Sequence, residues 1–308
     1  MIISKLFSLP CSLLVGLLAF SGTGFAGKEP PSRPSSSAVE KEYNLLSRLP
    51  VRHKTYYSYR EQFLHFKSTG QVERRETGSG YYTQEVVRLR PDGAPVSRVV
   101  RNHTQLRAES AEQKSAEPIN LDFGEGFTYE VCFGENYDYL PIDTSHLPNT
   151  LPGFMMFENI IHSHQFAILA TKTHGALDQL RRIGDTVTIP DSGKGGVVEF
   201  PGLLSITLVR GKSTMTFLGL SKYGAEPAAL LSWDVPLQFP NISGGEGTGR
   251  ATGLIWISLR DGEVLRGYLR QTTIHTLKGP NGAVTPANVD LEGWLEKIPQ
   301  ADYSTSAQ

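Results

Sequence analysis

The hydrophobic and polar positions of the chain form their clearest pattern over Arg250–Thr276. Two segments rich in Leu, Ile, Val and Thr flank Asp261-Gly262, and an Asp-Gly pair supplies the two positive φ angles of a type I′ turn. The stretch therefore predicts a β-hairpin of two long strands, which is the clearest structural signal in the chain.

The two faces of this predicted hairpin differ in character, because successive strand residues point to opposite faces. On the first strand one apolar face comprises Ile255, Ile257 and Leu259. On the second strand Leu265 and Leu269 lie on the face opposite to Arg266 and Arg270, and we expect these leucines to meet the core. The arginines are expected to face water or a cavity mouth; inside an enclosed cavity they would favour an anionic amphiphile. The predicted ligand-binding residues are Trp256, Tyr268, Arg266 and Arg270.

The remaining pattern predicts more strands and a few helices. Aromatic and β-branched residues interleaved with charge indicate strands over residues 53–104, 127–133 and from 184 onward, joined by Gly-containing turns. Apolar residues at helical spacing predict one long helix at Phe154–Arg182. Short helices are expected from the capping box Ser37–Glu40 to about Arg48, and near Val289–Ile298.

Together these elements predict an α+β fold. Its centre is a large curved antiparallel β-sheet, a half-barrel or open barrel, packed on one long apolar helix, with a short N-terminal helix. We expect a single domain over residues 37–298, preceded by a disordered leader at 27–36 and followed by a disordered tail at 299–308.

The N-terminus has the pattern of a secretory signal. Lys5 gives a positive start, Leu6–Phe20 is largely apolar, and Gly24 and Ala26 are small residues at the positions that signal peptidase reads. Residues 1–26 are therefore a predicted signal peptide; the alternative is an uncleaved anchor, for which the apolar run falls short of about 20 residues. We expect no integral membrane segment after cleavage.

Composition narrows the compartment and the partners. The chain has 308 residues, with 30 basic and 31 acidic side chains, so no general attraction to nucleic acid is expected. Removal of the signal would take Cys11 away and leave Cys132, which excludes an internal disulfide. A large exported protein without disulfides fits the bacterial periplasm or cell envelope.

One cluster of titratable residues falls on the predicted long helix. Glu158 and His162 are four residues apart, as are His174 and Asp178, so each pair shares a helix face and could bind a metal or act in hydrolysis. The two pairs point in different directions on a continuous helix, which favours ordinary hydrogen-bonded histidines over one metal site. Familiar catalytic and nucleotide-binding motifs are absent from the sequence, and no cofactor or metal is predicted.

The segment Gly253–Ser258 followed by Gly262–Arg266 looks like a strand-turn-strand common in secreted bacterial proteins, although Ser258 stands where that pattern usually has Asp. The combination of signal, early helix, strand meander, internal helix and late hairpins resembles the periplasmic lipoprotein-carrier fold of the LolA and LolB kind. The resemblance implies a curved half-barrel sheet, covered by helices, that holds acyl chains in an apolar cavity.

The sequence thus favours a non-enzymatic envelope protein that binds a lipid or another hydrophobic or amphiphilic small molecule between sheet and helix. Two alternatives stay open. One is a hydrolase that uses His162 or His174 with an acidic partner, with or without a metal. The other is a structural envelope protein that pairs through its sheet edges. The oligomeric state is left open.

Overall fold

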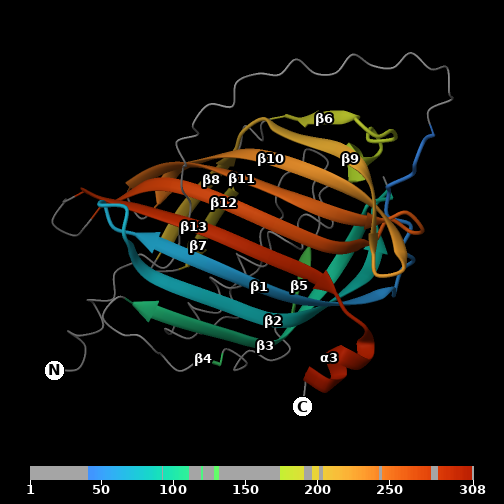
Figure 1. Ribbon diagram of the computed structural model, residues 1–308, viewed down its shortest axis with the longest axis horizontal. Helices are drawn as coiled ribbons and strands as arrows, with labels where there is room; N and C mark the ends of the chain where they lie inside the picture. The colour runs from blue at the N-terminus through green and yellow to red at the C-terminus, as the bar shows by residue number, and fades with distance from the viewer. Residues whose placement is uncertain are drawn as a thin grey trace.

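In the computed structural model, thirteen strands form one antiparallel β-sheet (Figure 1). The structure describes residues 41–91, 93–110, 119–120, 128–131, 174–190, 196–200, 204–242, 245–278 and 284–306. The first five strands are β1 Lys54–Phe66, β2 Val72–Leu89, β3 Pro95–Ser110, β4 Ile119–Asn120 and β5 Thr128–Val131. The later strands are β6 Thr186–Ile189, β7 Gly196–Phe200, β8 Leu204–Arg210, β9 Ser213–Tyr223, β10 Glu226–Ile242, β11 Gly245–Ser258, β12 Val264–Lys278 and β13 Val284–Lys297.

The strand order joins the two ends of the chain in the middle of the sheet. The hydrogen-bonded order is β4-β3-β2-β1-β13-β12-β11-β10-β8-β7, while β5 pairs with β3, and β9 pairs with both β10 and β6. Strand β1 lies between β2 and β13, with Tyr57 opposite Lys297 and Phe66 opposite Asn288. The contact between β1 and β13 is the seam between an N-terminal and a C-terminal half-sheet.

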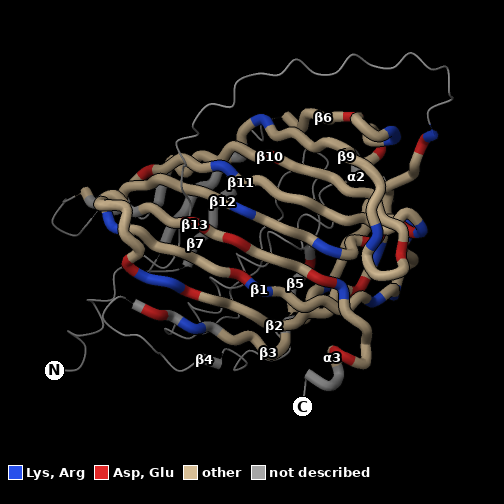
Figure 2. The backbone as a smooth tube through the Cα atoms, in the orientation of Figure 1, with Lys and Arg blue, Asp and Glu red and all other residues tan. Residues whose placement is uncertain are grey.

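The two faces of the sheet are chemically distinct because buried and exposed residues alternate along the strands. The buried face carries Tyr57, Phe63, Ile255, Leu269 and Leu291. The exposed face carries Arg60, Trp256, Tyr268, Arg270 and Trp294, and there the basic positions of β12 lie beside the acidic positions of β13 (Figure 2). This assignment confirms the prediction that Leu265 and Leu269 meet the core, since both are fully buried.

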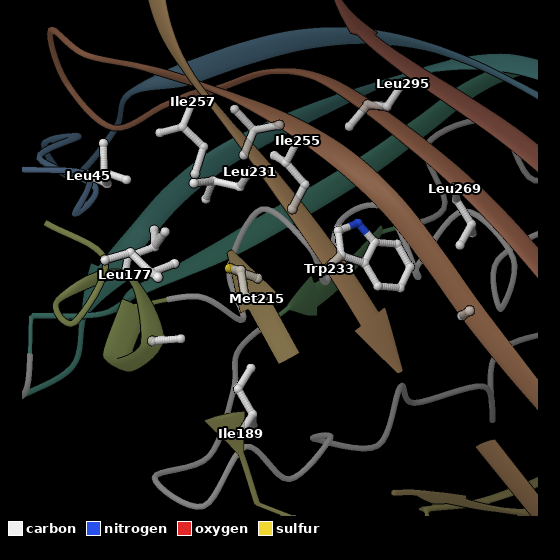
Figure 3. Packing of buried hydrophobic residues seen from close by; sticks show 14 of the residues in the cluster. Leu45, Leu177, Ile189, Met215, Leu231, Trp233, Ile255, Ile257, Leu269 and Leu295 are labelled. Atoms are coloured by element: carbon white, nitrogen blue, oxygen red, sulfur yellow. The ribbon is translucent and has the colours of Figure 1, made fainter. Parts of the chain in front are cut away.

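Segments outside the sheet contribute to the apolar core at one end of the buried face. Leu45 from the N-terminal segment and Leu177 belong to the same hydrophobic cluster as Leu231 and Ile257 (Figure 3). The ring of Tyr43 meets Phe217 edge-on at 5.6 Å between centroids. Segments before β1 and before β6 therefore cover this end of the sheet.

The predicted large antiparallel sheet is confirmed, but the α+β class is wrong. The part of the chain that the structure describes is nearly all β, and its helices are short: α2 is His174–Leu177 and α3 is Gln300–Ser306. Of the long helix predicted for residues 154–182, residues 154–173 lie outside the described residues. From residue 174 the chain forms one helical turn, because the amides of Arg181 and Arg182 donate to the Asp185 carboxylate at 2.9 and 2.7 Å instead of continuing a helical ladder.

The two predicted short helices are also corrected. Residues 41–50 are not helical, since the amide of Tyr43 donates to Arg181 O and that of Leu46 donates to the side chain of Asn44; residues 37–40 lie outside the described residues. The segment near Val289–Ile298 belongs to β13, where Val289, Leu291 and Leu295 keep a two-residue period on the buried face. In the predicted tail, α3 lies against the exposed face through Tyr303, whose ring is 5.0 Å from that of Tyr56.

The predicted hairpin is present as β11 and β12, with Ile255 opposite Gly267. Its turn differs from the predicted type I′: among described non-glycine residues only Arg52 and His103 have positive φ, so Asp261 does not, while Gly262 has φ of 75°. The loop is instead closed by Gly262 N donating to Ser258 O and Ser258 N donating to Glu263 O. The carboxylate of Asp261 accepts the Glu263 amide at 3.1 Å and fixes the wider loop.

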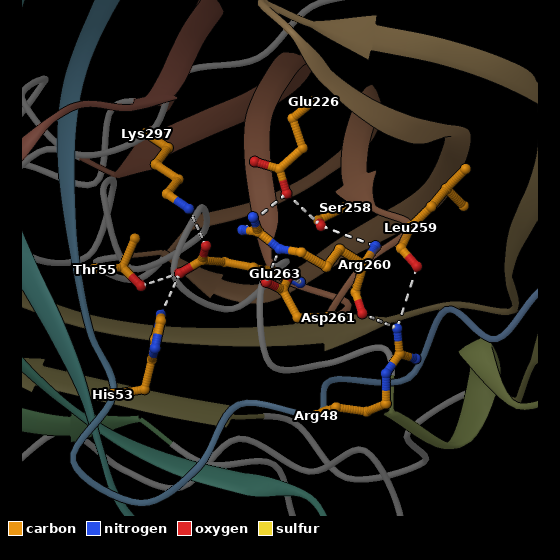
Figure 4. Close-up of polar contacts among 10 residues, drawn as sticks. All are labelled: Arg48, His53, Thr55, Glu226, Ser258, Leu259, Arg260, Asp261, Glu263 and Lys297. Atoms are coloured by element: carbon orange, nitrogen blue, oxygen red, sulfur yellow. Dashed lines mark hydrogen bonds and ion pairs between the residues drawn. The ribbon is translucent and has the colours of Figure 1, made fainter.

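The buried carboxylate of Glu263 ties this loop to the seam (Figure 4). Its side chain is 1% exposed and accepts hydrogen bonds from His53 Nε2 at 2.8 Å, from Thr55 Oγ1 and from Lys297 Nζ. Burial and the neighbouring Glu263 raise the pKa of Tyr57 well above its ordinary value, and the Tyr57 hydroxyl donates to Val264 O at 2.9 Å. One carboxylate thus joins the start of β1, the end of β13 and the hairpin loop.

Replacing Glu263 by Gln is expected to lower the free energy of unfolding by about 2–4 kcal/mol, because Lys297 and His53 lose the charge that compensates their burial. The matched control is Glu130→Gln, since Glu130 pairs with Arg88 at the surface, with side chains 42% and 59% exposed, where the loss is below about 1 kcal/mol. Urea unfolding of both variants measures the difference. Equal losses would contradict the assigned role of Glu263.

Gly262→Ala and Gly70→Ala form a second pair. Both glycines have positive φ, 75° and 82°, so both variants pay about 1 kcal/mol for a left-handed alanine. A methyl group at Gly262 would also meet the Leu46 carbonyl oxygen and lie 2.8 Å from Ser47 Cα, whereas nothing lies within 4 Å at Gly70. We expect Gly262→Ala to lose at least about 1 kcal/mol more, measured by thermal or urea unfolding; equal losses would show that the N-terminal segment does not pack on the loop.

Candidate functional site

The four predicted ligand-binding residues lie together, but on the exposed face of the hairpin. Trp256 is directly opposite Arg266, and the Arg266 guanidinium lies 5.3 Å from the Trp256 ring centroid. Tyr268 packs against Trp294 at 5.8 Å between ring centroids. Arg266 pairs with Glu296 at 3.3 Å and Arg270 with Asp290 at 3.9 Å. The two arginines are therefore balanced by acidic residues of β13.

A shallow groove of about 340 Å³ lies beside these residues on the exposed face. Tyr268 forms one wall of the groove. Partial burial and the neighbouring Glu292 raise the pKa of the Tyr268 hydroxyl. The other lining side chains include Thr214, Ser232, Asp234, Thr252 and Leu254. The groove is open and is lined by both apolar and hydroxyl-bearing side chains, and at its edge Asp234 accepts a hydrogen bond from Arg250 Nε at 2.7 Å.

Of the four residues in the predicted histidine and acid pairs, the structure describes the side chain of Asp178 alone. His174 begins α2, while the exposed carboxylate of Asp178 accepts a hydrogen bond from Arg181 at 2.9 Å. Glu158 and His162 lie outside the described residues. Within the described ranges there is no group of three or more His, Cys, Asp or Glu side chains arranged to hold a metal ion.

A different polar group lies on the buried face, at the end away from Leu45 and Leu177. We call it the polar end and define it as His65, Arg74, Glu76, Thr273 and His275. Strand pairing places His65 opposite Arg74 on β2 and opposite Val289 on β13, and Val289 is in turn opposite Thr273. The exposed fractions of His65, Glu76, Thr273 and His275 are 6%, 3%, 0% and 2%. Polar side chains thus share a face with the core and are as buried as the core.

At the polar end the charges of Arg74 and Glu76 compensate each other, whereas several other buried polar atoms lack a hydrogen-bond partner among the described residues. The Glu76 carboxylate pairs with Arg74 and lies 3.6 Å from His65 Nε2. Burial, with a contribution from His65, lowers the pKa of His275 to about 4, so this imidazole is neutral at pH 7. Thr273 Oγ1, His275 Nδ1 and His65 Nε2 are buried and have no hydrogen-bond partner in the part of the chain that the structure describes.

Glycines on β11 allow this arrangement. A Cβ atom at Gly247 would lie 2.6 Å from His275 Cβ, and one at Gly249 would lie 2.9 Å from Thr273 Oγ1. Any larger residue at these two positions would push the polar side chains away from β11. The local sequence of β11 is therefore adapted to Thr273 and His275 on the neighbouring strand.

Sequence reasoning missed the polar end, although a signal for it exists. His65 lies an even number of positions from Tyr57, Tyr59 and Phe63, so the alternation of β1 places its side chain on the core face. The same parity argument places Thr273 and His275 with Leu269 on β12. The polar identity of these residues concealed the pattern.

Comparisons with known proteins give likeness in fold alone. No protein-family model and no curated protein matches the sequence. A structure describing lipid–protein interactions in lipovitellin is similar at 10% identity and a TM-score of 0.39; the match covers 82% of this chain and 25% of that chain, about a quarter of its length.

Two bacterial structures are similar at lower scores. One is a predicted lipoprotein from Parabacteroides distasonis, at 8% identity and a TM-score of 0.23, with 82% of this chain and 97% of that chain covered. The other is a predicted exported protein with a YmcC-like fold from Bacteroides fragilis, at 7% identity and a TM-score of 0.19, with 82% and 97% covered. No helix among the described residues is long and apolar enough to cross a membrane.

The buried His275 predicts a specific pH dependence of stability. Between its folded pKa of about 4 and its ordinary value of 6.5, the unfolded chain binds a proton that the folded protein does not. Stability is therefore lost as the pH falls through this window, by about 3 kcal/mol at most. In His275→Asn the loss between pH 6.5 and 5 is expected to be smaller, as measured by urea unfolding of both proteins at each pH. An identical pH profile in the variant would contradict the burial of a neutral His275.

Proposed function

We propose that this protein binds an amphiphilic or hydrophobic small molecule, such as a lipid, on the buried face of the sheet. The observation that carries the proposal is the set of buried polar atoms at the polar end, next to an apolar surface. Leaving a buried donor or acceptor unpaired costs about 1–3 kcal/mol. A ligand whose polar group reaches Thr273 Oγ1 and His275 Nδ1 would remove that cost.

The apolar part of such a ligand has a surface to lie on. The row of Phe63, Leu291, Gln271 and Ala251 crosses the sheet directly beside the row of His65, Val289 and Thr273, and three of its four side chains are apolar. Toward the other end follow Leu269 and Ile255, both fully buried. An acyl chain running along this face from the polar end would meet the first apolar side chains about 7 Å from its head, because this is the spacing of neighbouring rows.

The proposal includes export. The basic, apolar and small-residue pattern of residues 1–26 supports a secretory signal and hence a place in the bacterial periplasm or envelope. A binding protein of this kind has no need of catalytic groups. The hydrolase that would use His162 or His174 stays a prediction.

The exposed-face groove is a second candidate location for a ligand. Trp256, Tyr268, Arg266 and Arg270 lie in or beside the groove of about 340 Å³, which is at the small end of ligand pockets. Its aromatic wall would take an apolar group and its hydroxyls a polar one. The two locations lie on opposite faces of the same strands, so they can be separated by mutation.

Neighbouring residues of β11 provide the test. Ala251 is 4% exposed on the buried face, whereas Thr252 lines the groove on the exposed face. We expect Ala251→Phe to weaken binding of a fluorescent fatty-acyl probe by at least about tenfold by filling the space of the acyl chain. Thr252→Phe should leave this affinity unchanged.

The outcomes separate the alternatives. Loss of binding only in Thr252→Phe would move the site to the exposed-face groove. If the wild-type protein binds no acyl probe and lipid mass spectrometry of an extract of the purified protein finds none, the proposal is wrong. Thermal unfolding of both variants confirms that each is folded before its affinity is compared.

A further inference from the structure

The polar end also carries information on the charge of the ligand, an inference that rests on the proposed function. We infer that the ligand's polar group is uncharged and bears hydroxyl groups, as in a monoacylglycerol or a long-chain alcohol, and is not a carboxylate, a phosphate or a quaternary amine. The inference comes from the charges and the free hydrogen-bonding atoms of the described side chains on this face.

No cation of the polar end is left to bind an anion. Arg74 is the one basic side chain defined there, and it already pairs with the Glu76 carboxylate. A further negative charge brought into this buried region would be repelled by Glu76 and would lose its hydration without a compensating cation.

A cationic head is disfavoured for a different reason. The carboxylate of Glu76 is already engaged by Arg74 and has His65 at 3.6 Å, so a quaternary amine would compete with an existing ion pair. Such an amine also has no N–H donor for the imidazole or hydroxyl atoms nearby. It would leave Thr273 and His275 as unpaired as before.

The atoms that lack a partner among the described residues match a hydroxyl group. Thr273 Oγ1 can donate and accept, and the neutral imidazole of His275 has one nitrogen that donates and one that accepts. His275 is on β12 and His65 is on β1, and β13 lies between these two strands. The separation of His275 Nδ1 from His65 Nε2 suits a head group with more than one hydroxyl. Both Thr273 and His275 are at least 98% buried, so their bonds would form in a region shielded from water.

The test uses three probes with the same chain length: a 1-monoacylglycerol, the corresponding fatty acid and the corresponding alkyltrimethylammonium. Binding to the full-length mature protein at neutral pH is measured by displacement of a fluorescent acyl probe. We expect the monoacylglycerol to bind at least about tenfold more tightly than either charged probe. Equal or tighter binding of the fatty acid or the ammonium would overturn the inference and leave the proposed function in place; failure of all three probes would refute the proposed function itself.

Thr273→Val and Thr272→Val locate the head. Thr273→Val keeps the shape of the side chain and removes one buried hydroxyl, so affinity for the monoacylglycerol should fall about fivefold, the value of one hydrogen bond. Thr272 lies on the exposed face, where it bonds to Asp290 at 3.2 Å, and Thr272→Val should leave affinity unchanged. Affinity for the fatty acid should change in neither variant. An unchanged monoacylglycerol affinity in a folded Thr273→Val protein would place the head elsewhere and overturn the inference.

Discussion

The contact of β1 with β13 is the constraint on which the rest of the sheet depends. Strands on one side of it come from the first part of the chain, and strands on the other side from the last part. Glu263 reinforces this seam with a carboxylate that His53, Thr55 and Lys297 all reach. Because three donors compensate this carboxylate, a charge that would be costly if unpaired becomes a specific connection between loop and strands. The seam also brings His65 of β1 onto the same surface as Thr273 of β12.

The buried face has two parts with different physical roles. Around Leu45 and Ile257 it is a hydrophobic core that stabilises the fold through burial. At the polar end the same face carries the ion-paired Arg74 and Glu76 and the uncharged Thr273 and His275. Buried polar groups at these positions do not stabilise the fold, because burying a polar group without a hydrogen-bond partner costs free energy. A departure from efficient packing of this kind is typical of a binding site.

Much of the fold could be predicted from the sequence, because it depends on a local period. The two-residue alternation of β1, β11 and β12 predicted the strands and the faces of the hairpin. Elements whose conformation depends on distant partners were predicted wrongly. Residues 41–50 form backbone hydrogen bonds with Arg181 and Asp261, and residues 289–295 form a strand because they pair with β1 and β12. For the site, the sequence grouped Trp256 and Tyr268 with two arginines expected to face water or a cavity mouth, and strand pairing places Trp256 directly opposite Arg266. His65 and His275 meet only through strand pairing, which no single stretch of sequence contains.

The seam has a consequence for how the protein folds. Tyr57 must pair with Lys297, so the centre of the sheet cannot form until nearly the whole chain is available. Contacts so distant in sequence fold slowly, because a long loop must be closed before they are gained. Until then β1 and β13 are the edges of two separate half-sheets, with unpaired amides and carbonyls open to other chains. The interval between synthesis and closure of the seam is therefore the period in which these strand edges can pair with other chains.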